Sequence, residues 1–326
     1  MSVLKHLWRP VKDRVAELIE LRVAPIEASV AAISSELAVL AGRMDGIEAC
    51  LEDQAARKLE VSRPVRLFSF ESRHDSAHVG DLGQDIPGDC PICGASCFFR
   101  GFTSNLRESG YCSSCGSFNR QRQIASMVRH CFCLGEDGPL ALPPSVAVYN
   151  TETTGALDAV LRGGTNYLNS EYFGPDYSPG QNVDGRRHED LQNLSIPSES
   201  IDLMLSSDVL EHMPSPYAAH REVFRILKPG GRHIFTVPFS VNAARDDIRA
   251  ELVDGEIKYL AEKLFHGDPV RPDEGILVWT IFGIEMILKL RDIGFDVNAW
   301  DAYNPGAGII GKLALVFEAR KPFTTA

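Results

Sequence analysis

The sequence predicts an α/β protein in which an open, mostly parallel sheet follows two smaller N-terminal units. Three observations lead to this prediction. Residues 190–238 read as a strand, a helix, a tight turn and a second strand, which is the order found in sheets whose parallel strands are connected by helices. Two CxxC pairs, at 90–93 and 112–115, precede this region. A heptad pattern of apolar residues runs through residues 19–51.

The heptad pattern predicts a coiled coil within residues 1–56. Its apolar residues alternate steps of four and three, and they are Ile19, Val23, Ile26, Val30, Ile33, Leu37, Leu40, Met44, Ile47 and Leu51. Isoleucine at the d positions disfavours a parallel dimer, so we expect a homo-oligomer that is a trimer or a tetramer. One long helix packed on the rest of the chain is the alternative.

Residues 1–18 lead into this helix with apolar residues at helical spacing and several Lys and Arg side chains. A basic amphipathic helix that carries Trp8 can lie on an anionic membrane surface, but a simple lead-in to the coiled coil is the favoured interpretation. Residues 57–87 mix Ser, Arg, His, Asp and Gly without periodicity, so we expect a linker there.

The two CxxC pairs predict a metal site in a small ribbon at residues 88–134. Eighteen residues separate Cys90 and Cys93 from Cys112 and Cys115, a spacing typical of a tetrahedral Zn²⁺ site. Four thiolates leave no open coordination position, so the expected zinc is structural. Disulfides are the competing explanation, and a cytoplasmic setting disfavours them.

A helix is expected over residues 117–130, after the second pair. Arg120 and Arg122 at its start either bind an anionic group of a substrate or form the salt bridges that fix the ribbon to the next domain, and the sequence leaves both interpretations open. Cys131 and Cys133 near its end are expected to serve packing rather than metal binding.

The elements of residues 190–238 place polar groups at the end of a strand. The apolar run 201–205 is followed by a Ser-Ser-Asp sequence, and ligands of open α/β sheets bind beyond the carboxyl ends of the strands. Residues 217–227 have helical spacing, and the Lys-Pro-Gly-Gly sequence that follows is typical of a helix end. Residues 232–237 then predict another strand.

This region resembles the class I S-adenosylmethionine-dependent methyltransferases of the type 11-like branch, through DVLEH at 208–212 and RILKPGG at 225–231. The resemblance covers residues 145–322 and implies a Rossmann-like, seven-stranded sheet. Residues 283–290 predict a helix, and 295–300 and 313–317 predict two strands, which agree with the antiparallel final strand of this family's sheet. Together with the ribbon, the chain is similar to a bacterial group of largely uncharacterised methyltransferases.

The resemblance places the methionine part of the cofactor at the loop after residues 146–150. Asn150, Glu152 and Gly155 are the residues assigned there, although Gly155 is all that remains of the usual glycine run. A helix is expected at 156–161, with Thr153 or Thr154 as its cap. The same glycine-poor loop would occur in a relative that no longer binds the cofactor.

The other cofactor contacts also follow from the resemblance. Glu171, at the end of the expected second strand, stands where the family has a carboxylate that accepts hydrogen bonds from both ribose hydroxyls. Asp190 would contact the adenine amino group, Leu191 would cover the ring, and Ser207 lies at the end of a neighbouring strand.

Methyl transfer from a sulfonium depends mainly on alignment, and a base is needed only if the acceptor must lose a proton. The candidates for such a base are His266, His212 and Asp208. His266 comes first because it lies in an insertion where this family builds its acceptor pocket. A structural role at a helix end is the favoured alternative for His212.

Charge and composition limit the function. The net charge of -11 and the pI near 5.3 argue against a broad nucleic-acid-binding surface. No apolar run reaches the roughly 20 residues of a membrane span, and we expect a cytoplasmic protein, with peripheral contact at the inner membrane surface as a variant. The expected function is methyl transfer to a small-molecule or glycan acceptor in cell-surface polysaccharide biosynthesis. Ribosomal-RNA methylation and a non-catalytic oligomeric scaffold are the alternatives.

Overall fold

The computed structural model describes residues 84–135, 137–164, 166–267, 275–311 and 314–323. All of them belong to one compact unit of the chain, Ser62–Ala326. The predicted coiled coil and amphipathic helix of residues 1–56, and nearly all of the predicted linker, lie outside the described residues. Within the described part of the chain, no helix is long and apolar enough to cross a membrane.

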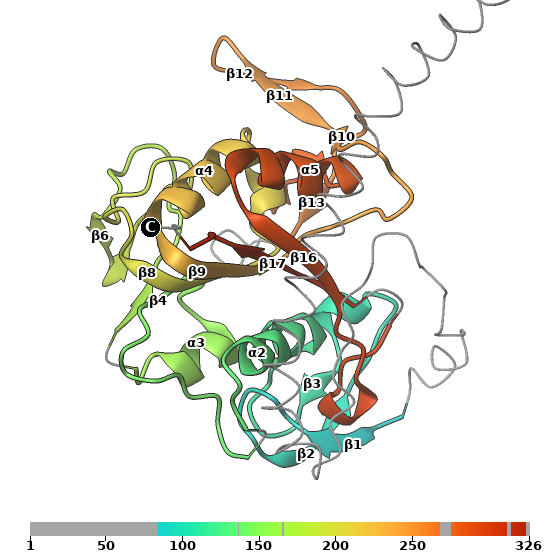
Figure 1. Cartoon of the computed structure of the whole chain (residues 1–326). Coiled ribbons are helices and arrows are strands. Elements are labelled where there is room, and N and C mark those ends of the chain that lie inside the picture. Colours follow the sequence, from blue (N-terminus) through green and yellow to red (C-terminus); the bar gives the residue numbers. More distant parts are fainter. Residues whose placement is uncertain (1–83, 136, 165, 268–274, 312–313, 324–326) are drawn as a thin grey trace, which may run out of the picture. The chain divides into compact units, whose positions relative to one another are not determined.

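A mixed sheet of six strands forms the centre of this unit, in the order β16, β17, β9, β8, β4, β5 (Figure 1). The strands are β4 (Val148–Asn150), β5 (Tyr167–Asn169), β8 (Ile201–Ser207), β9 (Leu227–Thr236), β16 (Asp296–Asp301) and β17 (Leu315–Arg320). β5, β4, β8 and β9 are parallel, whereas β17 is antiparallel to both β9 and β16. The predicted α/β sheet with an antiparallel last strand is therefore confirmed.

Helices cover both faces of the sheet (Figure 1). They are α2 (Asn119–Cys131), α3 (Gly155–Leu161), α4 (Pro216–Ile226) and α5 (Ile284–Ile293). Leu203 and Leu205 of β8 share a buried cluster with α2 and α3, and Met204 between them shares the opposite cluster with α4 and α5. Because both faces are covered, β8 is a nearly continuous apolar run rather than an alternating one.

On the side of β5, the described sheet lacks one of the seven strands that the resemblance implies. Here the described residues contain one parallel bridge, between Glu171 and His188, in place of a seventh strand. A two-residue hairpin, β6 (Asn182–Val183) with β7 (Arg186–Arg187), lies in the same segment. Residues 174–185 of this segment contain Pro and Gly, which shorten strands because proline cannot donate to the ladder and glycine weakens it.

The turn between α4 and β9 differs from the prediction in one respect. The helix ends at Ile226 as expected, but β9 begins at once with Leu227 and includes the Lys-Pro-Gly-Gly sequence. The register against β8 shifts within this stretch, because Ile201 pairs with Leu227 while Leu203 pairs with Arg232. The sequence that ends the helix therefore forms an irregularity inside the strand rather than a loop before it.

The ribbon precedes α2 and forms a three-stranded antiparallel sheet. Its strands are β1 (Ile86–Asp89), β2 (Ser96–Arg100) and β3 (Tyr111–Cys112), and the 3-10 helix η2 (Leu106–Glu108) lies between the last two. The connection from β16 to β17 contains another 3-10 helix, η4 (Pro305–Ala307), which packs against β1. The ribbon is thus connected to the sheet domain in two ways. It continues directly into α2, and it packs against the loop before β17.

Arg122 joins these parts. Its side chain is fully buried, and its guanidinium donates hydrogen bonds to the carbonyl oxygens of Ser117 and Gly110 in the ribbon. It also donates to the carbonyl of Gly308, after η4, at 2.8 Å. Arg122 therefore fixes the ribbon to the sheet domain, but through hydrogen bonds to backbone carbonyls rather than through the predicted salt bridges.

An insertion between β9 and α5 consists of short antiparallel pairs. The strands are β10 (Asp247–Ile248), β11 (Ala250–Val253), β12 (Glu256–Tyr259), β13 (Phe265–His266), β14 (Ile276–Leu277) and β15 (Thr280–Ile281). The pairing of β13 with β14 places His266 opposite Ile276. The 3-10 helix η3 (Leu210–His212), which follows β8, lies beside this insertion, because the amide of Trp279 donates to the Glu211 carbonyl at 2.7 Å.

Candidate active site

The loop from β4 to α3 brings the first group of predicted site residues to the carboxyl edge of the sheet. Asn150, the last residue of β4, is buried, and its side-chain amide donates to the Glu152 carbonyl at 3.2 Å and to the Tyr167 hydroxyl at 2.9 Å. The loop is therefore fixed to β5 by its own side chains rather than by a run of glycines.

Gly155 begins α3 with a φ of +92°. A Cβ at this position would also lie 2.8 Å from Nε2 of Gln121, a side chain of α2. The conformation with positive φ therefore favours the remaining glycine of the loop, and a larger residue would also displace the end of the Gln121 side chain.

The predicted cap of α3 is correct in its position, which Thr154 occupies, but makes no side-chain hydrogen bond. The Thr153 hydroxyl instead donates to Oε2 of Glu171 at 2.9 Å. This bond to a carboxylate orients the hydroxyl across the edge of the sheet.

Three side-chain atoms at this edge are buried and, among the residues that the structure describes, have no hydrogen-bond partner. They are Oγ1 of Thr151, Oε2 of Glu152 and Oγ of Ser207. Buried polar atoms are nearly always paired, and an unpaired one costs about 1–3 kcal/mol. All three belong to residues at or just after the carboxyl ends of β4 and β8, the edge where open α/β sheets bind ligands, so their chemistry fits a cofactor that carries ammonium, carboxylate and hydroxyl groups.

Glu152 has an unusual proton affinity. Burial of its carboxylate raises its pKa to about 7, against the influence of Arg120, and the nearby Glu171 and Asp208 carboxylates raise it further. The residue as a whole is half-buried, but Oε2 has no contact with solvent. Glu152 therefore changes charge near neutral pH.

Glu171, Asp190 and Leu191 lie along the outer part of the same edge. Glu171 follows β5 by two residues, and the amide of Glu189 donates to its carbonyl at 3.2 Å. Asp190 and Leu191 come next in the chain, with Leu191 only 6% exposed and Asp190 accepting a hydrogen bond from the Gln192 amide. The structure thus brings the predicted adenosine contacts to one edge.

Asp208 has a different environment from the one expected for a base. Arg107 of η2 donates to both of its carboxylate oxygens, and Arg120 of α2 donates to Oδ2 at 2.7 Å. Burial would raise the pKa of this carboxyl, but the two guanidinium groups hold it well below its usual range. A doubly paired carboxylate of this kind is a poor base, and its contacts join the ribbon to the end of β8. For Arg120, the structure therefore supports the interpretation in which it forms a salt bridge that fixes the ribbon to the sheet domain.

His212 and His266 meet around Glu211. Nε2 of His212 and Nδ1 of His266 each lie 3.7 Å from Oε1 of Glu211, and the two imidazole rings are 5.1 Å apart. Burial lowers the pKa of His266, which favours its neutral form. The sequence prediction named both histidines but missed Glu211, although an acid directly after a polar strand end is the available signal.

The four cysteines of the ribbon converge. Sγ of Cys90 lies 3.8 Å from Sγ of Cys115, Sγ of Cys93 lies 3.9 Å from Sγ of Cys112, and all four sulfurs are within 4.8 Å of one another. A tetrahedral zinc ion with Zn–S bonds of about 2.3 Å sets its sulfurs about 3.8 Å apart, whereas a disulfide requires about 2.05 Å. The donor set and spacing fit zinc.

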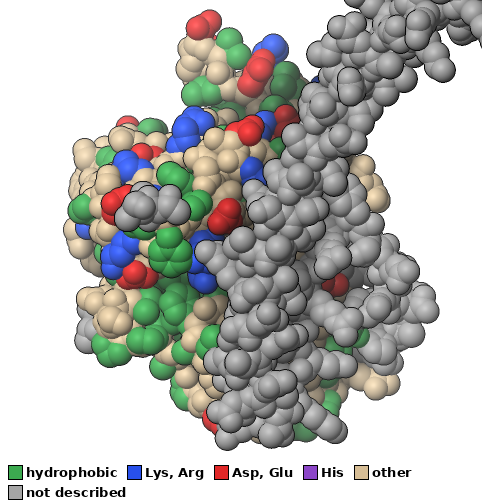
Figure 2. Space-filling model, viewed as in Figure 1, with side chains coloured by type: hydrophobic (Ala, Val, Ile, Leu, Met, Phe, Trp, Pro, Cys, Tyr) green, Lys and Arg blue, Asp and Glu red, His purple; other side chains and the backbone are tan. Residues whose placement is uncertain are grey.

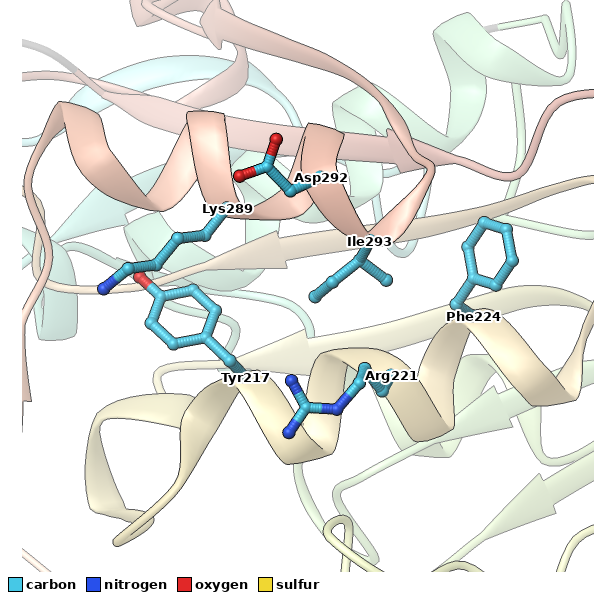
Figure 3. A pocket seen from close by; sticks show the side chains of 6 residues that line it. All are labelled: Tyr217, Arg221, Phe224, Lys289, Asp292 and Ile293. Carbon is cyan, nitrogen blue, oxygen red and sulfur yellow. The ribbon is translucent and has the colours of Figure 1, made fainter.

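A separate groove of about 720 Å³ lies between α4 and α5 (Figure 3). It is lined by Tyr217, Arg221, Phe224, Lys289, Asp292 and Ile293. Lys289 lies over the ring of Tyr217, with Nζ 4.5 Å from its centre. No predicted cofactor or catalytic residue lines this groove, so it is distinct from the edge described above.

Comparison with known proteins identifies methyltransferases as similar. A family model described as a methyltransferase domain matches residues 155–235, which include α3, β8, α4 and most of β9. An uncharacterised methyltransferase of Mycobacterium ulcerans is 25% identical over 114 residues, which are 34% of this chain and 45% of that protein. The chain therefore spans less than half the length of the curated relatives it matches.

Two solved structures are also similar. One is a SAM-dependent methyltransferase of Methanosarcina mazei, with 15% identity and a TM-score of 0.32 over 56% of this chain and 95% of that one. The other is an S-adenosylmethionine-dependent methyltransferase of Mesorhizobium loti, with 18% identity and a TM-score of 0.35 over 55% of this chain and 94% of that one.

Proposed function

Because the chain carries a class I S-adenosylmethionine-dependent methyltransferase domain, we propose that it transfers the methyl group of S-adenosylmethionine to a small-molecule or glycan acceptor. The unpaired polar atoms of Thr151, Glu152 and Ser207 are the observation that best supports binding of the cofactor at the sheet edge. Thr151 and Glu152 belong to the β4–α3 loop, where the resemblance places the methionine part, and Ser207 ends the neighbouring strand β8.

In this proposal Glu171 accepts hydrogen bonds from the ribose hydroxyls, and Asp190 and Leu191 hold the adenine. The hydrogen bond from Thr153 keeps the Glu171 side chain at the sheet edge. Glu152 pairs with the methionine ammonium, because it is the one acid among loop residues 151–154 and its carboxylate is buried. Transfer of the methyl group then requires an acceptor atom in line with the carbon–sulfur bond, in a site from which water is excluded.

Replacing Glu171 by Ala is expected to weaken S-adenosylmethionine binding roughly 10- to 150-fold, since hydrogen bonds to a charged group contribute about 1.5–3 kcal/mol. Calorimetric titration of the variant and the unaltered chain measures this change. Glu256→Ala, an exposed acid of β12, is the matched control and should leave the affinity unchanged. Equal affinities for the Glu171 variant and the unaltered chain would remove this residue from the site.

Cofactor affinity is expected to rise between pH 6 and pH 8. The pKa of Glu152 is about 7 without the cofactor, so below this pH the carboxyl must lose a proton before it can pair with an ammonium group. The affinity should rise by up to about tenfold per pH unit below the pKa and level off above it. Titrations at several pH values check this, and Glu152→Gln should remove the dependence. A flat profile for the unaltered chain would contradict the assignment.

We also propose that the four cysteines hold a structural Zn²⁺ ion. The sulfur–sulfur distances and the absence of an open coordination position support this role. Sγ of Cys97 lies 3.5 Å from Sγ of Cys112 and is not needed as a ligand, because the four sulfurs of the CxxC pairs already complete a tetrahedral site.

The remaining parts of the proposal concern partners and location. We propose that the chain forms a trimer or tetramer through residues 1–56. We also propose a cytoplasmic location with peripheral contact at the inner membrane surface. The role proposed for the methyl transfer is in cell-surface polysaccharide synthesis. Light scattering of the full chain, compared with a chain that begins at residue 57, tests the oligomer. A monomer in both cases would contradict it.

RNA methylation is less well supported. The chain has a net charge of -11, and binding to phosphate groups requires clustered Lys and Arg. On the face seen in Figure 2, basic and acidic side chains are interspersed, and no continuous basic area is visible on its coloured part. Nucleic acid that copurifies with the chain at high salt would reverse this preference.

A further inference from the structure

We propose that Glu211, His212 and His266 bind a divalent metal ion on the acceptor side of the active site, and that this ion binds the oxygen atoms of the acceptor. The second half of the proposal rests on the proposed methyltransferase function. The first half does not, because it concerns the three side chains alone.

The three ligand atoms are close to the spacing that a metal requires. Both histidine nitrogens lie 3.7 Å from Oε1 of Glu211, and one ligand atom from each residue can be chosen so that all lie within 4.8 Å of one another. Neighbouring ligands at about 2.0–2.2 Å from a divalent ion are about 3.0–3.4 Å apart. A small contraction of the side chains would therefore complete the site.

His212 is already oriented as metal-binding histidines are. Its Nδ1 lies 2.9 Å from the carbonyl oxygen of Leu277, and a carbonyl can only accept, so Nδ1 carries the proton and donates it. In the neutral ring, Nε2 is then the atom with the lone pair, and it is the nitrogen that lies toward Glu211. A second hydrogen bond of this kind fixes the tautomer and the ring direction of most histidine ligands.

Glu211 is the strongest indication that a cation is bound here. Its side chain is completely buried, and apart from a contact with its own backbone amide neither carboxylate oxygen accepts a hydrogen bond from the described residues. A buried carboxylate is unfavourable unless it is protonated or paired with a cation. Burial does raise the pKa of Glu211 well above its usual value, which makes a protonated acid the competing explanation.

Backbone contacts hold the three residues in this arrangement. The amide of Trp279 donates to the Glu211 carbonyl at 2.7 Å, and the amide of Val278 donates to the Leu264 carbonyl at 2.9 Å. His266 sits in β13, opposite Ile276 of β14. The insertion that carries His266 is thus hydrogen-bonded directly to the turn that carries Glu211.

The arginines nearby do not oppose a cation strongly. Arg107 and Arg120 are the basic groups that influence both Glu211 and His266. Arg107 donates to both oxygens of Asp208, and Arg120 donates to Asp208 and to Glu108. Their charges are therefore largely compensated by the carboxylates that they contact.

Three protein ligands leave positions on the ion for an acceptor that carries two adjacent oxygen atoms, such as a sugar diol. Coordination lowers the pKa of a hydroxyl group, so its proton passes to solvent. The resulting oxygen attacks the methyl carbon with its lone pair, and the carbon–sulfur bond breaks with its electron pair remaining on sulfur. The products are the methyl ether and S-adenosylhomocysteine. This chemistry favours O-methylation.

Manganese tests the site directly. Titration of MnCl₂ into the full chain, with the ribbon zinc in place, should show one Mn²⁺ bound per chain by calorimetry and by electron paramagnetic resonance. Thiolates prefer zinc, whereas a site of two imidazoles and a carboxylate accepts Mn²⁺. Glu211→Gln and His266→Ala should each weaken Mn²⁺ binding at least tenfold. The matched controls His130→Ala and Glu256→Gln, both at exposed residues, should not.

Two results would overturn the proposal. One is an unaltered chain that binds no Mn²⁺, which would favour the protonated acid. The other is Mn²⁺ binding that both variants retain. Thermal unfolding of the same samples shows whether each variant is folded, and S-adenosylmethionine titrations separate the two proposals. Cofactor binding without Mn²⁺ binding removes the metal site alone. Mn²⁺ binding without cofactor binding removes the methyltransferase function, and with it the acceptor half of this proposal, but leaves the metal site.

Discussion

Replacing Cys112 by Ser is expected to abolish stoichiometric zinc binding and to lower the free energy of unfolding by about 5 kcal/mol or more. Cys112 is 3% exposed and lies at the end of β3, so its loss leaves three thiolates in a buried site that needs four. Metal analysis and thermal unfolding measure the two effects.

The consequence should extend to the sheet domain. Gln121 of α2 approaches Gly155 closely, and Arg122 binds carbonyls in the ribbon and in the loop before β17. Loss of zinc is therefore expected to weaken S-adenosylmethionine binding as well. Cys133→Ser, at an exposed thiol, is the matched control and should change neither zinc content nor stability. A Cys112 variant with full zinc and unchanged unfolding would show that the cysteines are not ligands.

Replacing Asp208 by Ala is expected to destabilise the chain by about 3–5 kcal/mol, because removal of one partner from a buried ion pair leaves the other charge uncompensated. The side chain of Arg120 is only 10% exposed, and it would lose its closest carboxylate. Unfolding in denaturant measures the change.

Asp247→Ala provides the comparison, since it removes an ion pair of similar length whose carboxylate is 53% exposed. Exposed pairs contribute about 0–1 kcal/mol, so this variant should unfold almost as the unaltered chain does. If the two variants lost equal stability, the ribbon would not depend on Asp208 for its attachment to β8.

The regular elements of the sheet domain were predictable because each carries its own signal. The apolar run of β8, the helical spacing of α4 and the short connection before β17 required no knowledge of distant contacts, and their observed bounds lie within about three residues of the predicted ones. The meeting of the four cysteine sulfurs was predictable for a similar reason, since the spacing of the two pairs is typical of such a site.

The parts that were not predictable depend on residues far apart in the chain. Arg107 and Asp208 are 101 residues apart, and neither has a local pattern that indicates the other. The convergence of His266 on Glu211 depends on the pairing of β13 with β14 in an insertion without clear periodicity. The shortened edge beside β5 was missed because the resemblance, rather than the residues of that segment, supplied the seventh strand.

Calorimetric titration of S-adenosylmethionine into the full chain tests the central claim most directly. The account predicts one cofactor molecule bound per chain, a rise in the unfolding temperature with cofactor concentration, and a weaker affinity at pH 6 than at pH 8. A folded, zinc-containing chain that gives neither heat of binding nor a thermal shift would contradict the account and would favour the non-catalytic scaffold.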